Sequence, residues 1–154
     1  MLALAITGLH AAASSIFDIQ SNSDTDWIEL TNIGSKPITF DQLYLKVKTG
    51  PYARGYAVPL NCAHPKTGAC LVLKPRARVL LVAGPGKPLG YLPGPDTTTI
   101  RLGEKCRILN PDGDVVAVYQ SEDDCKSHRM PLAQVTFTRE PPKVQTDVLP
   151  DIPF

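Results

Sequence analysis

Short runs in which apolar and polar residues alternate follow one another along the chain. Between Trp27 and Thr31, Ile28 and Leu30 fall on one side and Trp27 and Glu29 on the other, which is the pattern of a strand. Similar runs lie at residues 16–19, 38–47, 56–60, 71–73, 79–82, 98–102, 107–109, 115–119 and 135–138. No window has convincing helical periodicity, and many short strands separated by turns are typical of an all-β sandwich or barrel.

Two sequence signals refine this prediction. Pro59 ends the run at residues 56–60, and proline is confined to strand edges, so this run is expected at the edge of a sheet. Asp112 and Gly113 lie in the turn sequence Asn-Pro-Asp-Gly-Asp between two apolar runs. This turn predicts a hairpin that joins residues 107–109 to residues 115–119, because Asp-Gly supplies the positive φ that tight turns require.

The first thirteen residues, MLALAITGLHAAA, have two interpretations. A secretory signal has an apolar run followed by small residues, but it also has a basic start, and the first base here is Lys36. The alternative is a strand with Leu2, Leu4 and Ile6 on one face and small or polar residues on the other. We expect the strand.

Length and composition favour one domain. The chain has 154 residues and a net charge of +1, and 15 residues are proline. This proline content is about twice the average share of roughly 5 %, which disfavours a helical bundle. No run reaches the roughly 18 apolar residues of a membrane span. We expect a single β-sandwich domain over residues 1–138 and a proline-rich extended tail over residues 139–154.

The near-neutral charge conceals a basic segment. Residues 46–87 contain bases and no acid, namely Lys46, Lys48, Arg54, Lys66, Lys74, Arg76, Arg78 and Lys87. If the fold gathers these bases on one face, they form contacts for an anion or a nucleic acid. If the strands distribute them over several faces, each face is locally balanced. The segment lacks the regular interleaving of bases and aromatics found in single-strand binders.

No constellation of catalytic residues is present in the sequence. His10, His64 and His128 are far apart, and none belongs to a hydrolase or metalloprotease motif. Asp24, Asp26 and Glu29 are interpreted as solvated acids near a turn rather than a weak Ca²⁺ site, since the twelve-residue loop is missing. The acidic run at residues 121–124 is interpreted as a solvated loop. We therefore predict no enzyme, no cofactor, no metal and no small-molecule substrate.

The four cysteines leave alternatives open. They are Cys62, Cys70, Cys106 and Cys125. Pairing of Cys62 with Cys70 and of Cys106 with Cys125 is the simplest scheme, and it indicates an extracellular location or the surface of a particle. Free buried thiols are the alternative, because cysteine packs as a small hydrophobe. The localisation stays unknown from the sequence.

The tail REPPKVQTDVLPDIPF favours an extended chain, because proline prevents helix formation. Its apolar residues prefer burial, either by packing back on their own sandwich or against another chain. We expect them to bind a partner protein or a neighbouring copy. These residues are Val144, Val148, Leu149, Ile152 and Phe154.

Several segments together resemble the lamin tail domain family over about residues 16–120. The segment Asp26–Asn32 with the turn that follows is similar to the family's opening strand, although residues 41–45 lack the usual Trp. Leu73–Val82 resembles the family's Leu-x-Pro-Gly strand, with Arg76 where Gly is common. Residues 100–116 resemble its closing hairpin. The resemblance implies an immunoglobulin-like β-sandwich of lamin-tail type, and such a fold does not fix a function.

Two functions are therefore expected. The first is a non-enzymatic structural or interaction module that docks on other subunits of a filament, surface layer or virus particle, with the tail as linker. The alternative is a nucleic-acid-binding module that uses residues 46–87, which the resemblance permits because lamin tails are associated with DNA.

Overall fold

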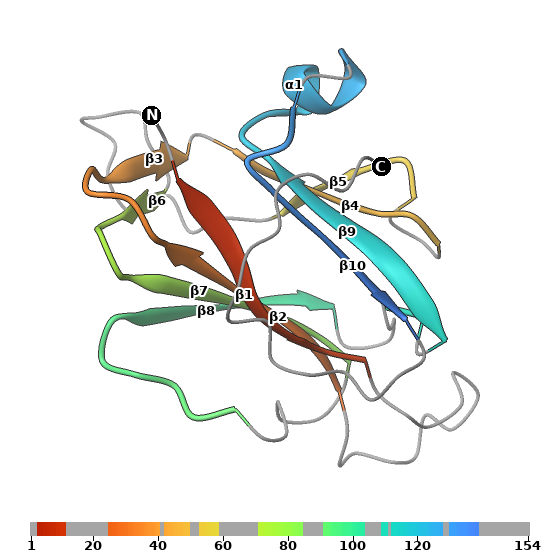
Figure 1. Ribbon diagram of the computed structural model, residues 1–154, viewed down its shortest axis with the longest axis horizontal. Coiled ribbons are helices and arrows are strands. Elements are labelled where there is room, and N and C mark those ends of the chain that lie inside the picture. Colours follow the sequence, from red (N-terminus) through yellow and green to blue (C-terminus); the bar gives the residue numbers. More distant parts are fainter. Residues whose placement is uncertain are drawn as a thin grey trace.

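A computed structural model describes most of residues 3–138, and its strands form two sheets packed face to face (Figure 1). The described residues are 3–11, 25–40, 42–49, 53–58, 71–84, 91–103, 109–110, 112–127 and 130–138. The predicted strand at residues 16–19 and most of the one at residues 107–109 lie outside these ranges. The whole predicted tail, residues 139–154, lies outside them too, and so does the predicted boundary between domain and tail. The all-β sandwich prediction is confirmed at this level.

The first sheet contains four strands in the order β1-β2-β7-β8. They are β1 (Leu4–His10), β2 (Asp26–Asn32), β7 (Arg78–Ala83) and β8 (Thr97–Gly103). Neighbours in this sheet are antiparallel, except that β8 is parallel to β7. The strand interpretation of the N-terminal segment is therefore confirmed for Leu4–His10, which form β1 and pair with β2 at the edge of the sheet, whereas Leu2 lies outside the described residues.

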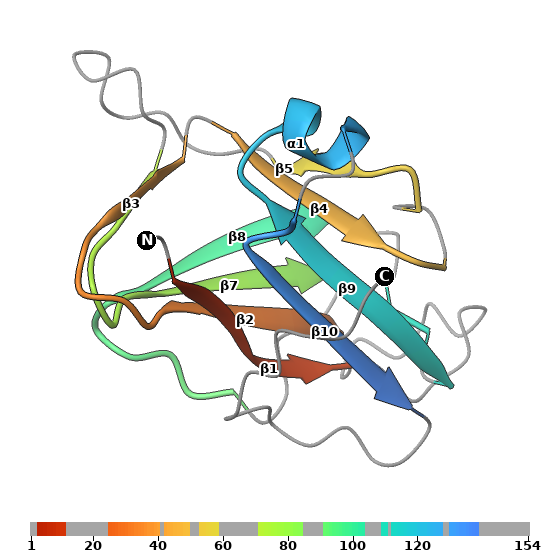
Figure 2. The ribbon, with the colours of Figure 1, turned by 45° about the horizontal axis from the view of Figure 1, so that its top comes forward.

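The second sheet contains four antiparallel strands in the order β10-β9-β4-β5. They are β10 (Ala133–Thr138), β9 (Gly113–Tyr119), β4 (Leu43–Val47) and β5 (Tyr56–Val58). β5 lies at the edge, as the proline after it predicts. Two short strands, β3 (Ile38–Phe40) and β6 (Leu71–Leu73), pair separately at one end of the sandwich (Figures 1 and 2).

The core lies between the sheets because the alternating patterns direct their apolar residues inward. Ile28 and Leu30 are almost completely buried there, as are Leu43, Leu45 and Val47. Full burial of one such side chain stabilises the fold by about 1.5–3 kcal/mol. On the opposite face of β2, Trp27 packs in a separate cluster with two residues of β7.

The predicted hairpin before β9 is not formed. The turn itself is present, since the Gly113 amide donates to the Asn110 carbonyl at 3.0 Å and Gly113 has a φ of +131°. However, both edges of β9 are already paired, with β4 and with β10. The preceding strand, β8, belongs to the other sheet, so this turn ends a connection between the sheets.

The acidic run is a short helix rather than a loop. α1 (Glu122–Lys126) begins at Ser121, whose side chain accepts a hydrogen bond from the Asp124 amide. The acidic residues lie in the first turn, where negative charge stabilises the helix dipole. The sequence pattern does not predict this helix, because a single helical turn is too short to show the 3.6-residue period of apolar positions. No helix that the structure describes has the length and apolar composition needed to cross a membrane.

Candidate interaction surface

Two turns that are distant in sequence meet at the end of the sandwich beside β3 and β6. The first turn, residues 33–37, joins β2 to β3, and the second, residues 74–77, joins β6 to β7. Asn32 lies between them with no exposed surface. Its side-chain amide donates to the Lys36 carbonyl and to the Leu73 carbonyl, both at 2.8 Å, and its side-chain oxygen accepts from the Gly34 amide at 2.9 Å. One buried side chain thus links both turns.

The second turn has the pattern of a type II β-turn. The Ala77 amide donates to the Lys74 carbonyl at 2.9 Å, Pro75 occupies the first central position, and Arg76 the second. A type II turn requires a positive φ at the second central position, and Arg76 has a φ of +69°. The Arg76 amide also donates to the Asn32 carbonyl at 2.8 Å, which anchors the turn to β2.

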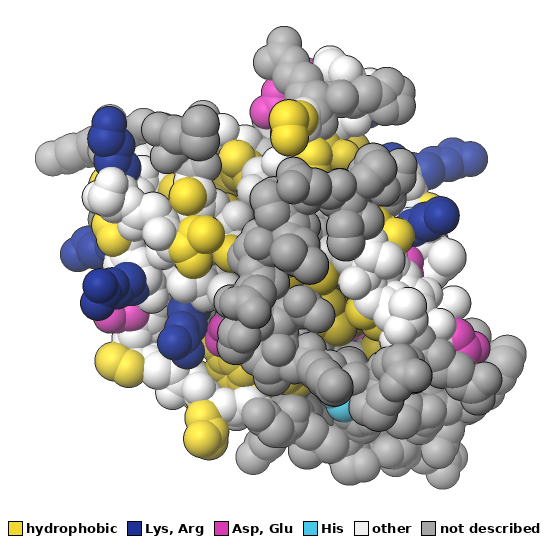
Figure 3. Space-filling model, viewed as in Figure 1, with side chains coloured by type: hydrophobic (Ala, Val, Ile, Leu, Met, Phe, Trp, Pro, Cys, Tyr) yellow, Lys and Arg dark blue, Asp and Glu magenta, His cyan; other side chains and the backbone are white. Residues whose placement is uncertain are grey.

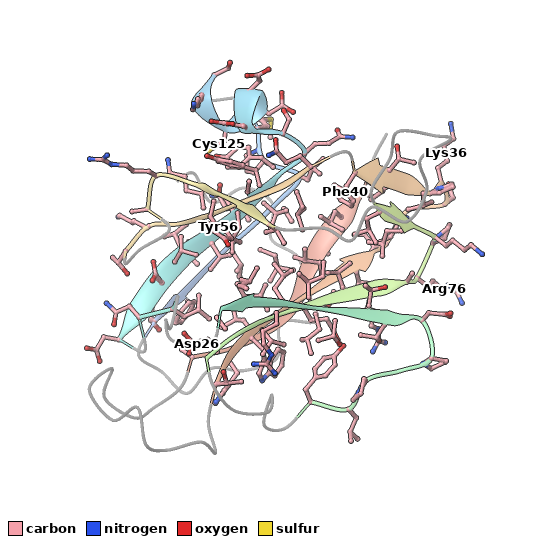
Figure 4. All side chains as sticks on the ribbon, turned by 180° about the vertical axis from the view of Figure 1, so that it is seen from behind. Asp26, Lys36, Phe40, Tyr56, Arg76 and Cys125 are labelled. Carbon is pink, nitrogen blue, oxygen red and sulfur yellow. The ribbon has the colours of Figure 1, made fainter. Side chains whose placement is uncertain are left out.

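The two turns present cations and apolar side chains together. Lys36, Lys74 and Arg76 are exposed, and none of them forms an ion pair with another residue that the structure describes. Ile33 of the first turn is 56 % exposed, and Val72 of β6 is 44 % exposed. Lys36 and Arg76 lie at the same end of the molecule (Figure 4). We call these five residues the cationic end.

The predicted basic segment does not form a single surface. Arg78 lies near the cationic end, but it forms an ion pair with Glu29 at 3.7 Å. Lys46, Lys48 and Arg54 belong to β4 or to the turns beside it, in the other sheet. Lys and Arg side chains accordingly appear at two opposite sides in Figure 3. Lys66 and Lys87 lie outside the described residues.

A polar cluster lies on the outer face of the first sheet. Glu29 is nearly buried and accepts a hydrogen bond from the Thr7 hydroxyl, which also lies 2.7 Å from the Thr31 hydroxyl. Tyr91 packs beside it against Trp27, with ring centroids 5.1 Å apart. Burial raises the pKa of Tyr91, and the neighbouring Glu29 raises this pKa further. These contacts hold the outer face of β2 together, so we assign the cluster a structural role.

Asp26 is not the solvated turn acid that the sequence predicts. It begins β2, has no exposed surface and accepts a hydrogen bond from the Leu109 amide at 2.9 Å. Asp24 lies outside the described residues, and Glu29 is engaged on the sheet face as described above. Within the described part of the chain, no three His, Cys, Asp or Glu side chains gather as metal ligands do.

Of the two alternatives left open for Cys125, a disulfide with Cys106 or a free buried thiol, the structure has the free buried thiol. α1 directs its side chain into a cluster with Tyr44, Ala117 and Tyr119, where it packs as a small hydrophobe. Burial there raises the pKa of the Cys125 thiol. Cys62, Cys70 and Cys106 lie outside the described residues.

The five apolar tail residues proposed to bind a partner, Val144 to Phe154, also lie outside the described residues. Sequence reasoning placed no weight on Ile33 and Val72, since isolated apolar residues are common on surfaces. Of the five residues of the cationic end, the sequence marks only Lys74 and Arg76 as candidates for binding, since Lys36 lies outside the basic segment 46–87. Comparison of the sequence with protein-family models gives no match, and comparison with curated proteins gives none either.

Proposed function

We propose that this chain is a non-enzymatic interaction module that docks on another protein through its cationic end. The observation that carries the proposal is the combination of exposed Lys36, Lys74, Arg76 and Ile33 on two linked turns with exposed Val72 on the adjoining strand β6. Protein interfaces combine an apolar centre with arginine and a polar rim, and complementary charge directs the encounter. A partner surface that is acidic and partly apolar fits this end.

Binding of nucleic acid is the alternative, and the distribution of charge supports it less well. Surfaces that bind nucleic acid are strongly positive and follow the phosphate backbone over a long path. The described bases of the segment 46–87 are divided between two ends of the sandwich, and Arg78 is partly neutralised by Glu29. The exposed aliphatic side chains of Ile33 and Val72 in the same turns and strands favour a protein partner.

The immunoglobulin-like, lamin-tail type of sandwich also belongs to this proposal. In its support, the segment Asp26–Asn32 forms β2, and the Leu-x-Pro segment leads into β7. We further propose that residues 139–154 link the domain to a neighbouring subunit in an assembly such as a filament, surface layer or virus particle.

Two matched double variants test the docking surface. The chain and each variant are immobilised, and proteins from nuclease-treated extract of the source cells are captured and identified. Lys36→Glu with Lys74→Glu should abolish capture of a specific partner, whereas Lys48→Glu with Arg54→Glu should not, although both pairs change the net charge equally. Equal capture by all three proteins would refute docking at the cationic end. A partner that is captured only when the nuclease treatment is omitted would favour the nucleic-acid alternative.

The linker is tested by the mass of the protein in solution. Light scattering of the full chain and of a chain truncated after Arg139 should show an oligomer that is lost on truncation while the circular dichroism spectrum is unchanged. An oligomer that survives truncation would mean that the tail is not the linker.

A further inference from the structure

The backbone at Arg76 is in a conformation that this residue type disfavours. A φ of +69° suits glycine, whereas a residue with a Cβ pays about 1 kcal/mol or more to adopt it. The turn needs only the backbone atoms of this residue, namely the amide bonded to Asn32 and the hydrogen bond between Ala77 and Lys74. Glycine would supply the same backbone atoms without strain.

The Arg76 side chain does not offset this strain through a contact inside the described part of the chain. It is exposed, and it forms no ion pair or hydrogen bond with the residues described there. Strain of this kind is retained where the residue has a use, and the inference runs from the observed outlier to the use. A use outside the molecule is therefore indicated.

The same turn fixes the position of the Arg76 backbone. Pro75 precedes it, and the Asn32 carbonyl holds its amide at 2.8 Å. A fixed backbone reduces the conformational entropy that binding must remove, so only the side chain has to be ordered. Lys36 adds a positive charge at the same end (Figure 4). Lys74, which is exposed and begins the same turn as Arg76, adds another.

We propose that Arg76 is the anchor of the cationic end and that it binds a carboxylate of an acidic segment in a partner protein. A guanidinium pairs with a carboxylate through two parallel hydrogen bonds, which a lysine cannot reproduce. Ile33 and Val72 accept an aliphatic side chain next to that carboxylate. The inference rests on the proposed function. It adds that Arg76 is the binding residue and that a carboxylate is the group it binds.

The test measures binding and folding stability on the same variants of the full chain. The probe is a fluorescently labelled peptide in which Glu and Leu alternate, followed by anisotropy at low salt, and a peptide with Gln in place of Glu is the control. Arg76→Gly should weaken peptide binding about tenfold or more while the unfolding temperature stays the same or rises. Arg76→Lys should weaken binding less, and Arg54→Gln on the other sheet should leave it unchanged.

Four results would overturn the inference. They are no binding of the glutamate peptide by the native chain, native-like binding by Arg76→Gly, a lower unfolding temperature for Arg76→Gly, and tighter binding to a labelled DNA duplex than to the peptide. If the double variant Lys36→Glu with Lys74→Glu loses its captured partner but Arg76→Gly keeps it, the proposed docking surface is supported and the anchor role of Arg76 is refuted. If neither variant loses the partner, the proposed function itself fails.

Discussion

Replacing Asn32 with Ala should destabilise the domain and disorganise the cationic end. The side chain is fully buried and makes three hydrogen bonds, to the carbonyls of Lys36 and Leu73 and from the Gly34 amide. Two of these bonds tie the turn at residues 33–37 to the end of β2, and the third ties the end of β6, directly before the second turn, to it. Alanine supplies none of them.

The magnitude follows from these three bonds. A net hydrogen bond contributes about 1 kcal/mol, and a buried group left without its partner costs about 1–3 kcal/mol. The Asn32→Ala change should therefore lower the free energy of unfolding by about 3–5 kcal/mol, a large part of the roughly 5–15 kcal/mol of a typical domain. Asn32→Asp should cost at least as much, because a charged acceptor then faces two carbonyl oxygens.

Equilibrium unfolding in urea measures this loss. Trp27 is the single tryptophan and is buried, so its fluorescence reports the transition. Asn110→Ala is the matched control, since the Asn110 side chain accepts one exposed hydrogen bond, from the Asp112 amide. The control should cost less than about 1 kcal/mol. A loss below about 1 kcal/mol for Asn32→Ala, with an unchanged dependence on urea, would refute the role given to Asn32.

Three further changes test other parts of the fold. Asp114→Asn should lower the free energy of unfolding, measured in urea titrations, by about 2–3 kcal/mol. The reason is that the Asp114 carboxylate accepts hydrogen bonds from both the amide and the hydroxyl of Thr49. A loss under about 0.5 kcal/mol would contradict this. Gly55→Ala should lower the melting temperature strongly, because Gly55 has a φ of +95° and an added Cβ would overlap the Tyr44 ring. An unchanged melting temperature in calorimetry would contradict this prediction. Burial holds the pKa of Cys125 above its ordinary value of 9.0, so its contribution to stability is complete below about pH 9 and is lost as the pH rises through the higher folded value. Peptide mapping after iodoacetamide treatment at pH 8 should then show Cys125 protected in the folded chain and alkylated in urea, and alkylation in the folded chain would be the opposite result.

Much of the fold was predictable because its signals are local. The alternation in Trp27–Thr31 and in Leu43–Val47 reports which side of each strand faces the core between the sheets, and the structure confirms both. The opposite sides are also buried, in separate clusters that the alternation does not predict. The hairpin before β9 was wrong for a non-local reason, since β9 already has two partners that no nearby sequence reveals. A free buried thiol was one of the alternatives for Cys125, but the short helix that carries Cys125 into its cluster was not predicted.

The candidate surface was predictable only in part. Lys36, Lys74 and Arg76 are visible in the sequence as bases. Their gathering at one end depends on Asn32, whose partners lie up to 41 residues away in the chain. The positive φ of Arg76 depends on the turn that β6 and β7 impose.

The sequence by itself determined the all-β class, the faces of its strands and the sites of several turns. These properties depend on the period of apolar residues and on the conformational limits of proline and glycine, which act within a few residues. Only the tertiary structure decided which strands pair, which bases stand together and which acids are buried. Those outcomes depend on contacts between segments that are distant in the chain, because each strand satisfies its hydrogen bonds with whichever partner the complete core allows.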